Sequence, residues 1–501
     1  MHGRNAWTES AARCCLAIVV AATLLGGSLV FARDQAASPA GRRQRLADEA
    51  AAKYQACKDA TDQKNEAALK TAIPAAIEAY TELLKVDPSS AEAYRQRGIL
   101  YWKLGNKDAA FRDFTAAIEA KSPDAMACRC RGDILLDRKQ PLVALDDFNK
   151  AIALEPKSGE AVLGRAEAQR ALGQSIEAIA SCTEAIALDT KLLRAFHVRA
   201  YAYEDARQFE QMVDDLNRFI ESDKTFAEAY LDRARGLIRL GRVQQSVVDL
   251  NRSIALNPQF TTAYYLRAQV AATAGQWLPA ISDSTKIIDT DPTYADAYVV
   301  RAVAYLELER FNNAVDDCTS ALDLDASCKN AHRIRGQALA ELEQHGEAIT
   351  DLRIANELDP TNPHILANLA RVHLDLKQYL AAVEACDRII GLNEDFADAY
   401  SIRGEAYREL KEFAKALLNF DQAISLDPKS PFGYLFRGIT QEDTGNLLLA
   451  KKDYQKAIEL DPKNAEARKR HDDLVKRLEK ETPAQTDSIF ELPQDDRAGR
   501  K

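Results

Sequence analysis

Hydrophobic and small residues recur along the chain with a period of 34 positions. If Ala91 is position one, eleven consecutive blocks of 34 residues follow without insertion or deletion and end at residue 464. Position eight is Gly or Ala in every block, and position 20 is Ala in nine of the eleven. Small residues at fixed positions let two helices approach closely, so each block predicts a pair of packed helices.

Bulky residues occupy complementary positions in the same blocks. Position four is mostly aromatic, as in Tyr94 and Tyr264, and position 24 is large, as in Phe114 and Phe148. Proline recurs at position 32, where it cannot continue a helix. Leu-Gly-Asn at 104–106 marks a turn inside a block, because Gly favours helix ends. Each block therefore predicts helix, turn, helix.

This combination of small residues at positions eight and 20, bulky residues at four and 24, Ala at 27 and Pro at 32 resembles the tetratricopeptide repeat. The resemblance covers residues 91–464 and implies an all-α fold, a right-handed α-solenoid of helix-turn-helix repeats. In this family the first helix of each repeat lines a concave groove that binds proteins or peptides. A non-catalytic scaffold for protein–protein interaction is therefore the expected function.

The repeat array has irregular ends. Residues 57–90 resemble a degenerate repeat in which only the second helix, with Tyr80 and Leu83, is recognisable. We expect 33–56 to be a linker, from Arg33 to about Arg45, and an N-terminal helix. Residues 465–480 have Leu474, Val475 and Leu478 on one side, which predicts a capping helix. The polar segment 481–501 is expected to be disordered.

Position seven carries a charge that the repeat pattern normally lacks. It is Arg in ten of the eleven blocks, and position 23 is Asp in eight. The block at Pro363 has Leu369 and Ala385 instead, so both partners are lost together. We predict a partly buried Arg–Asp bridge between the two helices of each block. The alternative is a basic stripe that binds an anionic ligand. This alternative fits poorly, because each Arg has its own carboxylate.

The N-terminal segment reads as an export signal. Arg4 and Arg13 precede an uncharged apolar run over residues 14–32, and Val30 and Ala32 form a small-residue cleavage site. Cleavage after Ala32 gives a periplasmic or secreted protein. An uncleaved membrane anchor at 14–32 is the alternative, although the run is short for a spanning helix.

Composition excludes several classes of function. The net charge is −10, and no basic stripe for nucleic acid is present. The repeats leave no room for a catalytic domain, and no catalytic or cofactor-binding motif occurs. His364 and His373 are nine residues apart, which is not a metal-ligand spacing. We expect no catalytic residue, cofactor or metal.

Groove positions implied by the family are two, five, nine, twelve and thirteen, and they carry ten basic and seventeen acidic residues. The set of Lys and Asn with which some members hold a C-terminal carboxylate is not reproduced in adjacent blocks. A mostly apolar stretch crosses three central blocks and suits an extended or helical peptide. Its candidate partner-binding residues are Leu231, Ile238, Tyr265, Gln269, Ala272, Val299, Val303 and Leu306. Burial of part of this surface against neighbouring helices is the alternative.

The sequence leaves three functions open. The first is an exported scaffold that gathers partner proteins for envelope assembly or secretion. The second is an accessory subunit that presents substrates to an enzyme on another chain. The third is a self-associating structural rod, so homo-oligomers belong to this expectation.

Overall fold

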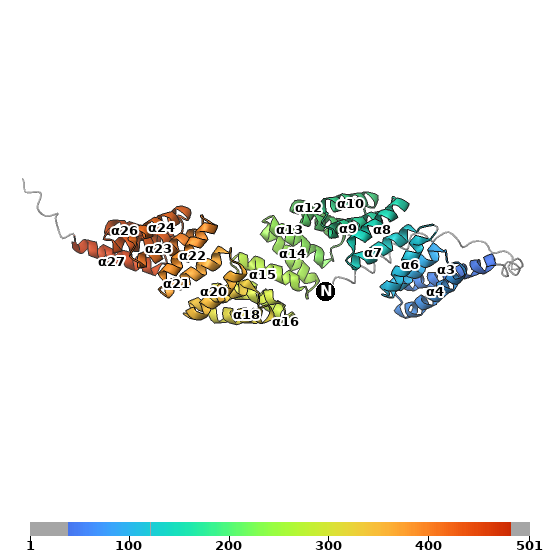
Figure 1. Cartoon of the computed structure of the whole chain (residues 1–501), viewed down its shortest axis with the longest axis horizontal. Coiled ribbons are helices and arrows are strands. Elements are labelled where there is room, and N and C mark those ends of the chain that lie inside the picture. Colours follow the sequence, from blue (N-terminus) through green and yellow to red (C-terminus); the bar gives the residue numbers. More distant parts are fainter. Residues whose placement is uncertain (1–38, 121, 482–501) are drawn as a thin grey trace, which may run out of the picture. The chain divides into compact units, whose positions relative to one another are not determined.

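The structure is a computed structural model that describes residues 39–120 and 122–481. Over these residues it contains 25 helices, α3 to α27, and no strand (Figure 1). The all-α prediction is confirmed. The predicted signal or anchor at 14–32, the cleavage site after Ala32 and the tail from 482 lie outside the described residues.

The chain divides into two compact units, which are described separately. Unit 1 ends at Pro258 and unit 2 begins at Gln259. Within each unit the helices form hairpins that stack on one another in chain order, as an α-solenoid of helical repeats does. Each second helix packs on the first helix of its own repeat and, within the unit, on the first helix of the next.

Every predicted block forms two helices separated by a tight turn. In unit 1 they are α5 (Ala91–Lys103), α6 (Lys107–Glu119), α7 (Ala125–Asp137), α8 (Pro141–Leu154), α9 (Gly159–Ala171), α10 (Ser175–Leu188), α11 (Leu193–Asp205), α12 (Phe209–Ser222), α13 (Ala227–Arg239) and α14 (Val243–Leu256). In unit 2 they are α15 (Thr261–Thr273), α16 (Trp277–Thr290), α17 (Ala295–Glu307), α18 (Phe311–Leu324), α19 (Lys329–Glu341), α20 (His345–Leu358), α21 (Pro363–Asp375), α22 (Tyr379–Leu392), α23 (Ala397–Glu409), α24 (Phe413–Leu426), α25 (Pro431–Asp443) and α26 (Leu447–Leu460). The helix-turn-helix prediction is confirmed, and each first helix begins at position one.

Position 15, in the turn between the helices, has a positive φ in all eleven repeats. Five repeats have Gly there, as at Gly105 (φ 77°). The other six have Lys, Arg or Glu, as at Lys139 (φ 58°). The left-handed conformation costs a residue with a Cβ about 1–2 kcal/mol, so the stacked helices impose this turn where the local sequence does not favour it.

Small and large residues interlock in the core as predicted. A Cβ on Gly98 would lie 2.7 Å from Phe114 Cε1, which is too close for any side chain. Phe114, Phe148 and Phe420, all at position 24, are fully buried. Cysteine takes the same position in other repeats, where Cys182 and Cys318 are also fully buried, and all seven described cysteines carry free thiols.

The N-terminal hairpin differs from the predicted boundaries. Its helices are α3 (Pro39–Asp62) and α4 (Glu66–Val86). Residues from Pro39 to Arg45 are therefore helical rather than part of a linker, and the hairpin is longer than the predicted 57–90 repeat. Burial of Tyr54 and Cys57 on α3 against Tyr80 on α4 explains why the first helix begins before residue 57.

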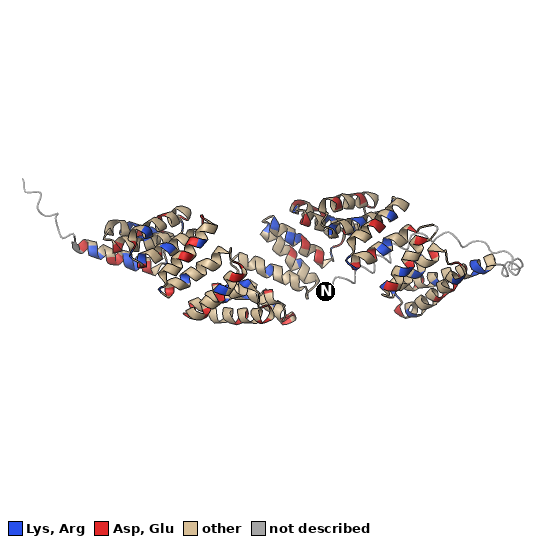
Figure 2. Cartoon of the chain, in the orientation of Figure 1, with Lys and Arg blue, Asp and Glu red and all other residues tan. Residues whose placement is uncertain are grey.

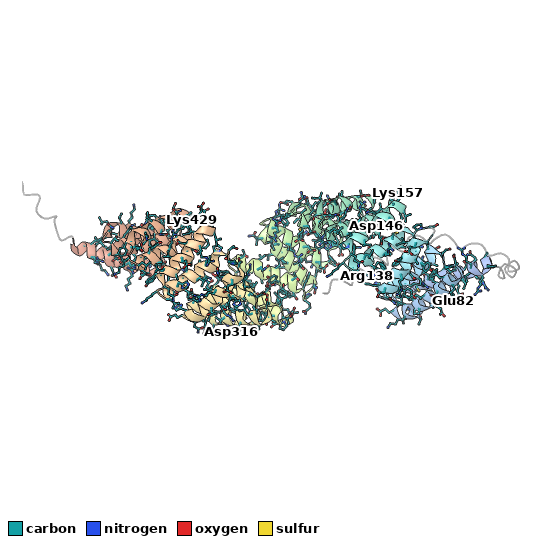
Figure 3. All side chains as sticks on the ribbon, in the orientation of Figure 1. Glu82, Arg138, Asp146, Lys157, Asp316 and Lys429 are labelled. Carbon is teal, nitrogen blue, oxygen red and sulfur yellow. The ribbon has the colours of Figure 1, made fainter. Side chains whose placement is uncertain are left out.

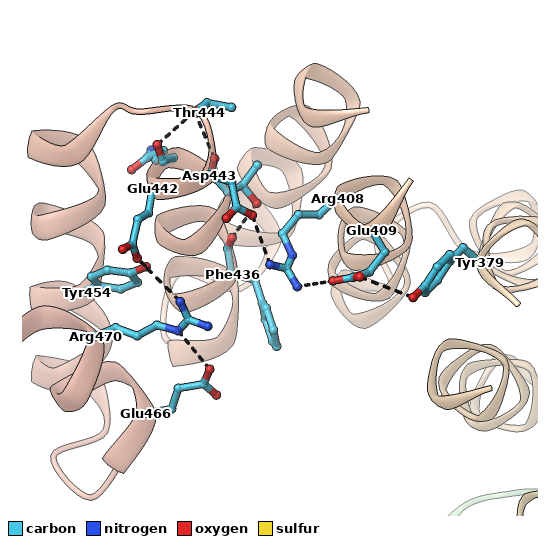
Figure 4. Close-up of polar contacts among 12 residues, drawn as sticks. Tyr379, Arg408, Glu409, Phe436, Glu442, Asp443, Thr444, Tyr454, Glu466 and Arg470 are labelled. Carbon is cyan, nitrogen blue, oxygen red and sulfur yellow. Dashed lines mark hydrogen bonds and ion pairs between the residues drawn. The ribbon is translucent and has the colours of Figure 1, made fainter. Parts of the chain in front are cut away.

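The last helix, α27 (Ala465–Glu481), covers the end of unit 2. Leu474 is fully buried in a cluster with Tyr454 of α26. A polar contact also holds this helix, because Arg477 Nη1 donates to Glu442 Oε1 of α25 at 2.9 Å. Tyr454 Oη of α26 donates to the other oxygen of the same carboxylate at 2.6 Å. Figure 4 shows Glu442 next to Tyr454, with Arg470 close to both.

The surface of both units carries charges of both signs. Figure 2 shows acidic and basic residues interspersed along the helices rather than separated by sign. Exposed charges such as Glu82, Asp146 and Lys429 are labelled in Figure 3. Among helices in the described ranges, none is both long and apolar enough to cross a membrane.

Candidate functional site

The arginines at position seven are used by the fold itself. Eight of them donate from Nε and Nη2 to both carboxylate oxygens of the Asp at position 23, at 2.6–2.8 Å. The pairs are Arg97–Asp113, Arg131–Asp147, Arg199–Asp215, Arg233–Asp249, Arg267–Asp283, Arg301–Asp317, Arg335–Asp351 and Arg437–Asp453. The predicted bridge between the helices of a repeat is confirmed, and these arginines are not a free basic stripe.

Several of these arginines also reach the preceding repeat. Arg131 Nη1 donates to Thr115 Oγ1 at 3.2 Å, and Arg301 Nη1 donates to Thr285 Oγ1 at 3.0 Å. One guanidinium therefore joins three helices and links consecutive repeats. The sequence analysis missed this contact, although Thr recurs at position 25.

The two repeats with Arg but no Asp use other acceptors. Arg165 Nε donates to Ser181 Oγ at 3.0 Å, and its Nη2 pairs with Glu184. Arg403 Nε donates to Asn419 Oδ1 at 2.8 Å. In the repeat that lacks both partners, Leu369 and Ala385 pack into the apolar core instead.

The sequence predicts a partner-binding surface on the first helices of the repeats. We call positions two, five, nine, twelve and thirteen of these helices the first-helix face. Of the predicted partner-binding residues on this face, Leu231 and Ile238 belong to unit 1 and the other six belong to unit 2.

In unit 1, Leu231 is only 3% exposed and Ile238 is half-buried. Leu231 therefore has little surface to offer a partner, which agrees with the alternative that packing covers part of the predicted patch. In unit 2, Leu306 is likewise buried, in the cluster beneath the first-helix face.

The other predicted residues of unit 2 are partly buried and lie on α15 and α17, which pack against each other: Tyr265, Gln269, Ala272, Val299 and Val303. Gln269 Nε2 donates to Tyr265 Oη at 2.8 Å, and the Tyr265 ring lies 5.4 Å from that of Tyr294. These contacts hold the tyrosine in place. The result is a preformed, mostly apolar surface in unit 2.

A polar cluster that the sequence analysis did not identify lies in unit 1. Asp232 is 3% exposed and accepts hydrogen bonds from Tyr201 Oη at 2.8 Å and Arg235 Nη1 at 3.2 Å. His197 Nε2 lies 2.9 Å from the same carboxylate. The only sequence signal was that His197 and Tyr201 both occupy first-helix face positions.

Two glutamates at position nine have shifted acidity. Burial raises the pKa of Glu167 to about 7, although Arg194 lies 2.6 Å away. Burial also raises the pKa of Glu405 to about 7, against the opposing effect of Arg371 and Arg408. Both carboxyl groups can therefore gain a proton near neutral pH.

Arg408 lies at the C-terminal end of the same face. It donates to Asp443 Oδ2 at 3.2 Å and pairs with Glu409, to which Tyr379 donates at 3.4 Å (Figure 4). Nη1 and Nη2 of this arginine are therefore paired with carboxylates of its own chain, whereas its buried Nε has no hydrogen-bond partner among the described residues.

Other candidate chemistry is limited. In residues 39–120 and 122–481, no group of three or more His, Cys, Asp or Glu could hold a metal ion. His364 packs its ring against Phe396, and His373 Nδ1 lies 2.7 Å from Gln378 Oε1. A shallow pocket of about 360 Å³ between α18, α19 and α20 contains Arg335 and Asp351, which pair with each other.

Comparison with known proteins identifies the repeats. Models described as "TPR repeat" or "Tetratricopeptide repeat" together match more than half of the chain. They match residues 72–105, 91–124, 131–191, 299–363, 363–396, 397–430 and 433–464. No curated protein matches the chain.

Several solved structures are similar to the chain over half of its length or more. The Cut9–Hcn1 hetero-tetramer of APC/C shares 15% identity over 90% of this chain and 99% of that chain, with a TM-score of 0.47. Yeast Tom70 shares 14% identity over 80% and 97%, with a TM-score of 0.39. A tetratricopeptide repeat protein from Parabacteroides merdae shares 18% identity over 50% and 98%, with a TM-score of 0.40.

The 34-residue helical hairpins and the family matches agree. The chain belongs to the tetratricopeptide repeat family, whose repeats bind protein or peptide partners, and it is a protein–protein interaction scaffold.

Proposed function

We propose that this protein is an exported, non-catalytic scaffold that binds a partner protein or peptide along the first-helix face, in envelope assembly or secretion. The observation that carries the proposal is the apolar pair Val299 and Val303, partly buried on α17, which packs against the helix that carries Tyr265. The same two positions in α7 hold Arg129 and Asp133. Apolar side chains left partly open on a rigid helix suit a partner's hydrophobic anchor.

The N-terminal apolar run supports export, because charge followed by an apolar segment and small residues is what a secretory signal requires. The mass of the protein purified from an expressing bacterium tests this part. A mature chain that begins at Arg33 agrees with cleavage after Ala32. An intact mass in the membrane fraction supports the anchor instead, and an intact mass in the cytosol contradicts export.

Binding is tested by affinity capture from an envelope extract with residues 33–501 as bait. Tyr265→Asp with Val303→Asp should lose a partner that the parent chain captures, because two charges then interrupt the apolar surface. Val248→Asp is the matched control, since Val248 is 67% exposed on the second helix α14. Leu231 is not changed, because its burial would turn the test into one of folding.

A second candidate, the self-associating rod, is favoured by exposed hydrophobic residues on second helices. Leu142 on α8 and Ile176 on α10 occupy the same repeat position in consecutive repeats and are 69% and 63% exposed. Light scattering tests this candidate. A concentration-dependent oligomer that Leu142→Asp with Ile176→Asp makes monomeric would support it, and a parent chain that stays monomeric would contradict it.

A further inference from the structure

An arginine on the first-helix face of unit 2 lacks a carboxylate partner. Arg333 lies on α19 at position five, the position of Val299 in the preceding repeat. Burial lowers the pKa of this guanidinium, because the cation has lost much of its water. Within the described parts of the chain, the Arg333 side chain makes no hydrogen bond or ion pair.

The other two arginines at position five are neutralised. Arg95 Nε lies 2.9 Å from Asp124 Oδ2, and its Nη2 lies 3.7 Å from Glu92 Oε1. Arg129 Nη1 lies 3.4 Å from Asp133 Oδ2. The partners come from position 34, position two and position nine of the same repeat.

Around Arg333, all three of these positions carry amides. Asn362 replaces the aspartate at position 34, Asn330 the glutamate at position two, and Gln337 the aspartate at position nine. Amides keep the hydrogen-bonding capacity of the carboxylates but remove the negative charge. The repeat therefore keeps a partly buried cation and replaces each of the acids that neutralise its equivalents.

A second arginine without a hydrogen-bonded carboxylate lies on the next first helix. Asn368 Nδ2 of α21 donates to Gln337 Oε1 at 3.4 Å and links the two helices. Arg371, one turn further along α21, is exposed, and its side chain makes no hydrogen bond or ion pair with the described residues. It occupies the position of Val303 and is attracted electrostatically to Glu405 on α23. Two guanidiniums without a hydrogen-bonded carboxylate therefore follow the apolar pair on consecutive first helices.

Resting on the proposed function, we propose that the face formed by α19 and α21 binds acidic side chains of an extended partner segment, whose apolar side chains lie on Val299 and Val303. Carboxylates of this segment accept hydrogen bonds from Arg333 and Arg371. Charge-assisted bonds of this kind are strongest where water is excluded, and the partner supplies the negative charge that the chain itself withholds. The ligand is thus a peptide with acidic residues next to apolar ones, although the chain as a whole is acidic.

Three variants of the full chain separate this claim from general peptide binding. Arg333→Gln removes the cation. Gln337→Glu supplies an internal partner one turn away, as Asp133 does for Arg129, and should compete with the ligand without disturbing the fold. Gln211→Glu adds the same charge on the exposed face of α12 in unit 1 and is the control.

The probe is a display library of random peptides of about 12 residues, fused through their C-termini so that only side chains supply carboxylates. The parent chain and Gln211→Glu should enrich peptides with acidic residues beside apolar ones. Arg333→Gln and Gln337→Glu should lose this enrichment. A synthetic, amidated copy of the best peptide should bind both variants at least about tenfold more weakly than the parent.

Each contrary result has a distinct meaning. Enriched peptides without acidic residues, or equal affinity for the parent and Gln337→Glu, would overturn the inference and leave peptide binding intact. Binding only by synthetic peptides with a free C-terminus would place the carboxylate at a chain end and overturn the side-chain claim. No enrichment by the parent chain would count against the proposed binding face as well.

Discussion

Arg267 donates from Nε and Nη2 to the two carboxylate oxygens of Asp283, each at 2.7 Å, and joins α15 to α16. Asp283 is nearly buried, so Arg267→Ala leaves a carboxylate without its cation. Loss of one partner of a buried pair costs about 3–5 kcal/mol, and the variant should unfold at clearly lower urea concentration.

The double variant Arg267→Leu with Asp283→Ala should recover much of this loss, because Leu369 and Ala385 already fill the same positions in another repeat. Urea unfolding of Arg267→Leu, of Asp283→Ala and of the double variant gives the coupling free energy between the two side chains. A double variant no more stable than Arg267→Ala would show that the bridge does not act as a pair.

Gly164 on α9 is required by the ring of Phe148. A Cβ there would lie 2.2 Å from Phe148 Cε1, and Phe148 is fully buried in the core. Gly164→Ala should therefore lower the free energy of unfolding by about 1–3 kcal/mol. Gly391→Ala is the control, since a Cβ at that helical position meets open space. It should be neutral or stabilise by up to about 1 kcal/mol, and equal effects of both variants would refute the packing argument.

Glu405 makes stability depend on pH. Its pKa is raised by burial to about 7 in the folded chain, so the folded state holds the proton more tightly than the unfolded state. Stability from this group is complete below the unfolded pKa of about 4.3 and is lost as pH rises to about 7. At pH 8, Glu405→Gln should have a free energy of unfolding up to about 3 kcal/mol higher than the parent and should melt at a higher temperature. At pH 4.5 the two chains should melt at a similar temperature. The same difference at both pH values would contradict the raised pKa.

Leu474 seals the end of unit 2. It is fully buried against α26, so Leu474→Ala should cost about 2–5 kcal/mol. Repeats contact only their neighbours, so amide exchange should accelerate mainly in α26 and α27. Leu448→Ala, on the exposed side of α26, should leave exchange nearly unchanged. Uniform acceleration along unit 2 would instead mean that its repeats unfold as one.

The fold was predictable because the same sequence pattern recurs in eleven consecutive repeats. Eleven copies of one pattern show that position eight must be small and that Arg131 and Asp147 belong together. The turn at Lys139 was not visible, since its left-handed conformation is imposed by packing and not by a glycine. The start of α3 at Pro39 was missed, because that hairpin does not keep the register of the regular repeats.

The site was less predictable than the fold. Position numbers place Leu231 and Val303 on equivalent faces, but only the neighbouring helices decide that Leu231 is covered and Val303 is partly open. The first-helix face carries more acidic than basic residues in total, and this total does not show that Arg333 lacks an acidic partner. Its isolation depends on three amides from different turns, and it becomes visible only when each partner position is compared with Arg95 and Arg129.

Site-specific photo-crosslinking tests the central claim, that the first-helix face holds a partner. A photoreactive phenylalanine analogue replaces Val303 in one full-length chain and Val248 in another, and both are irradiated in intact cells that express them. We expect a defined crosslinked partner from position 303 and none from position 248. The same products from both positions, or a product from position 248 alone, would contradict it.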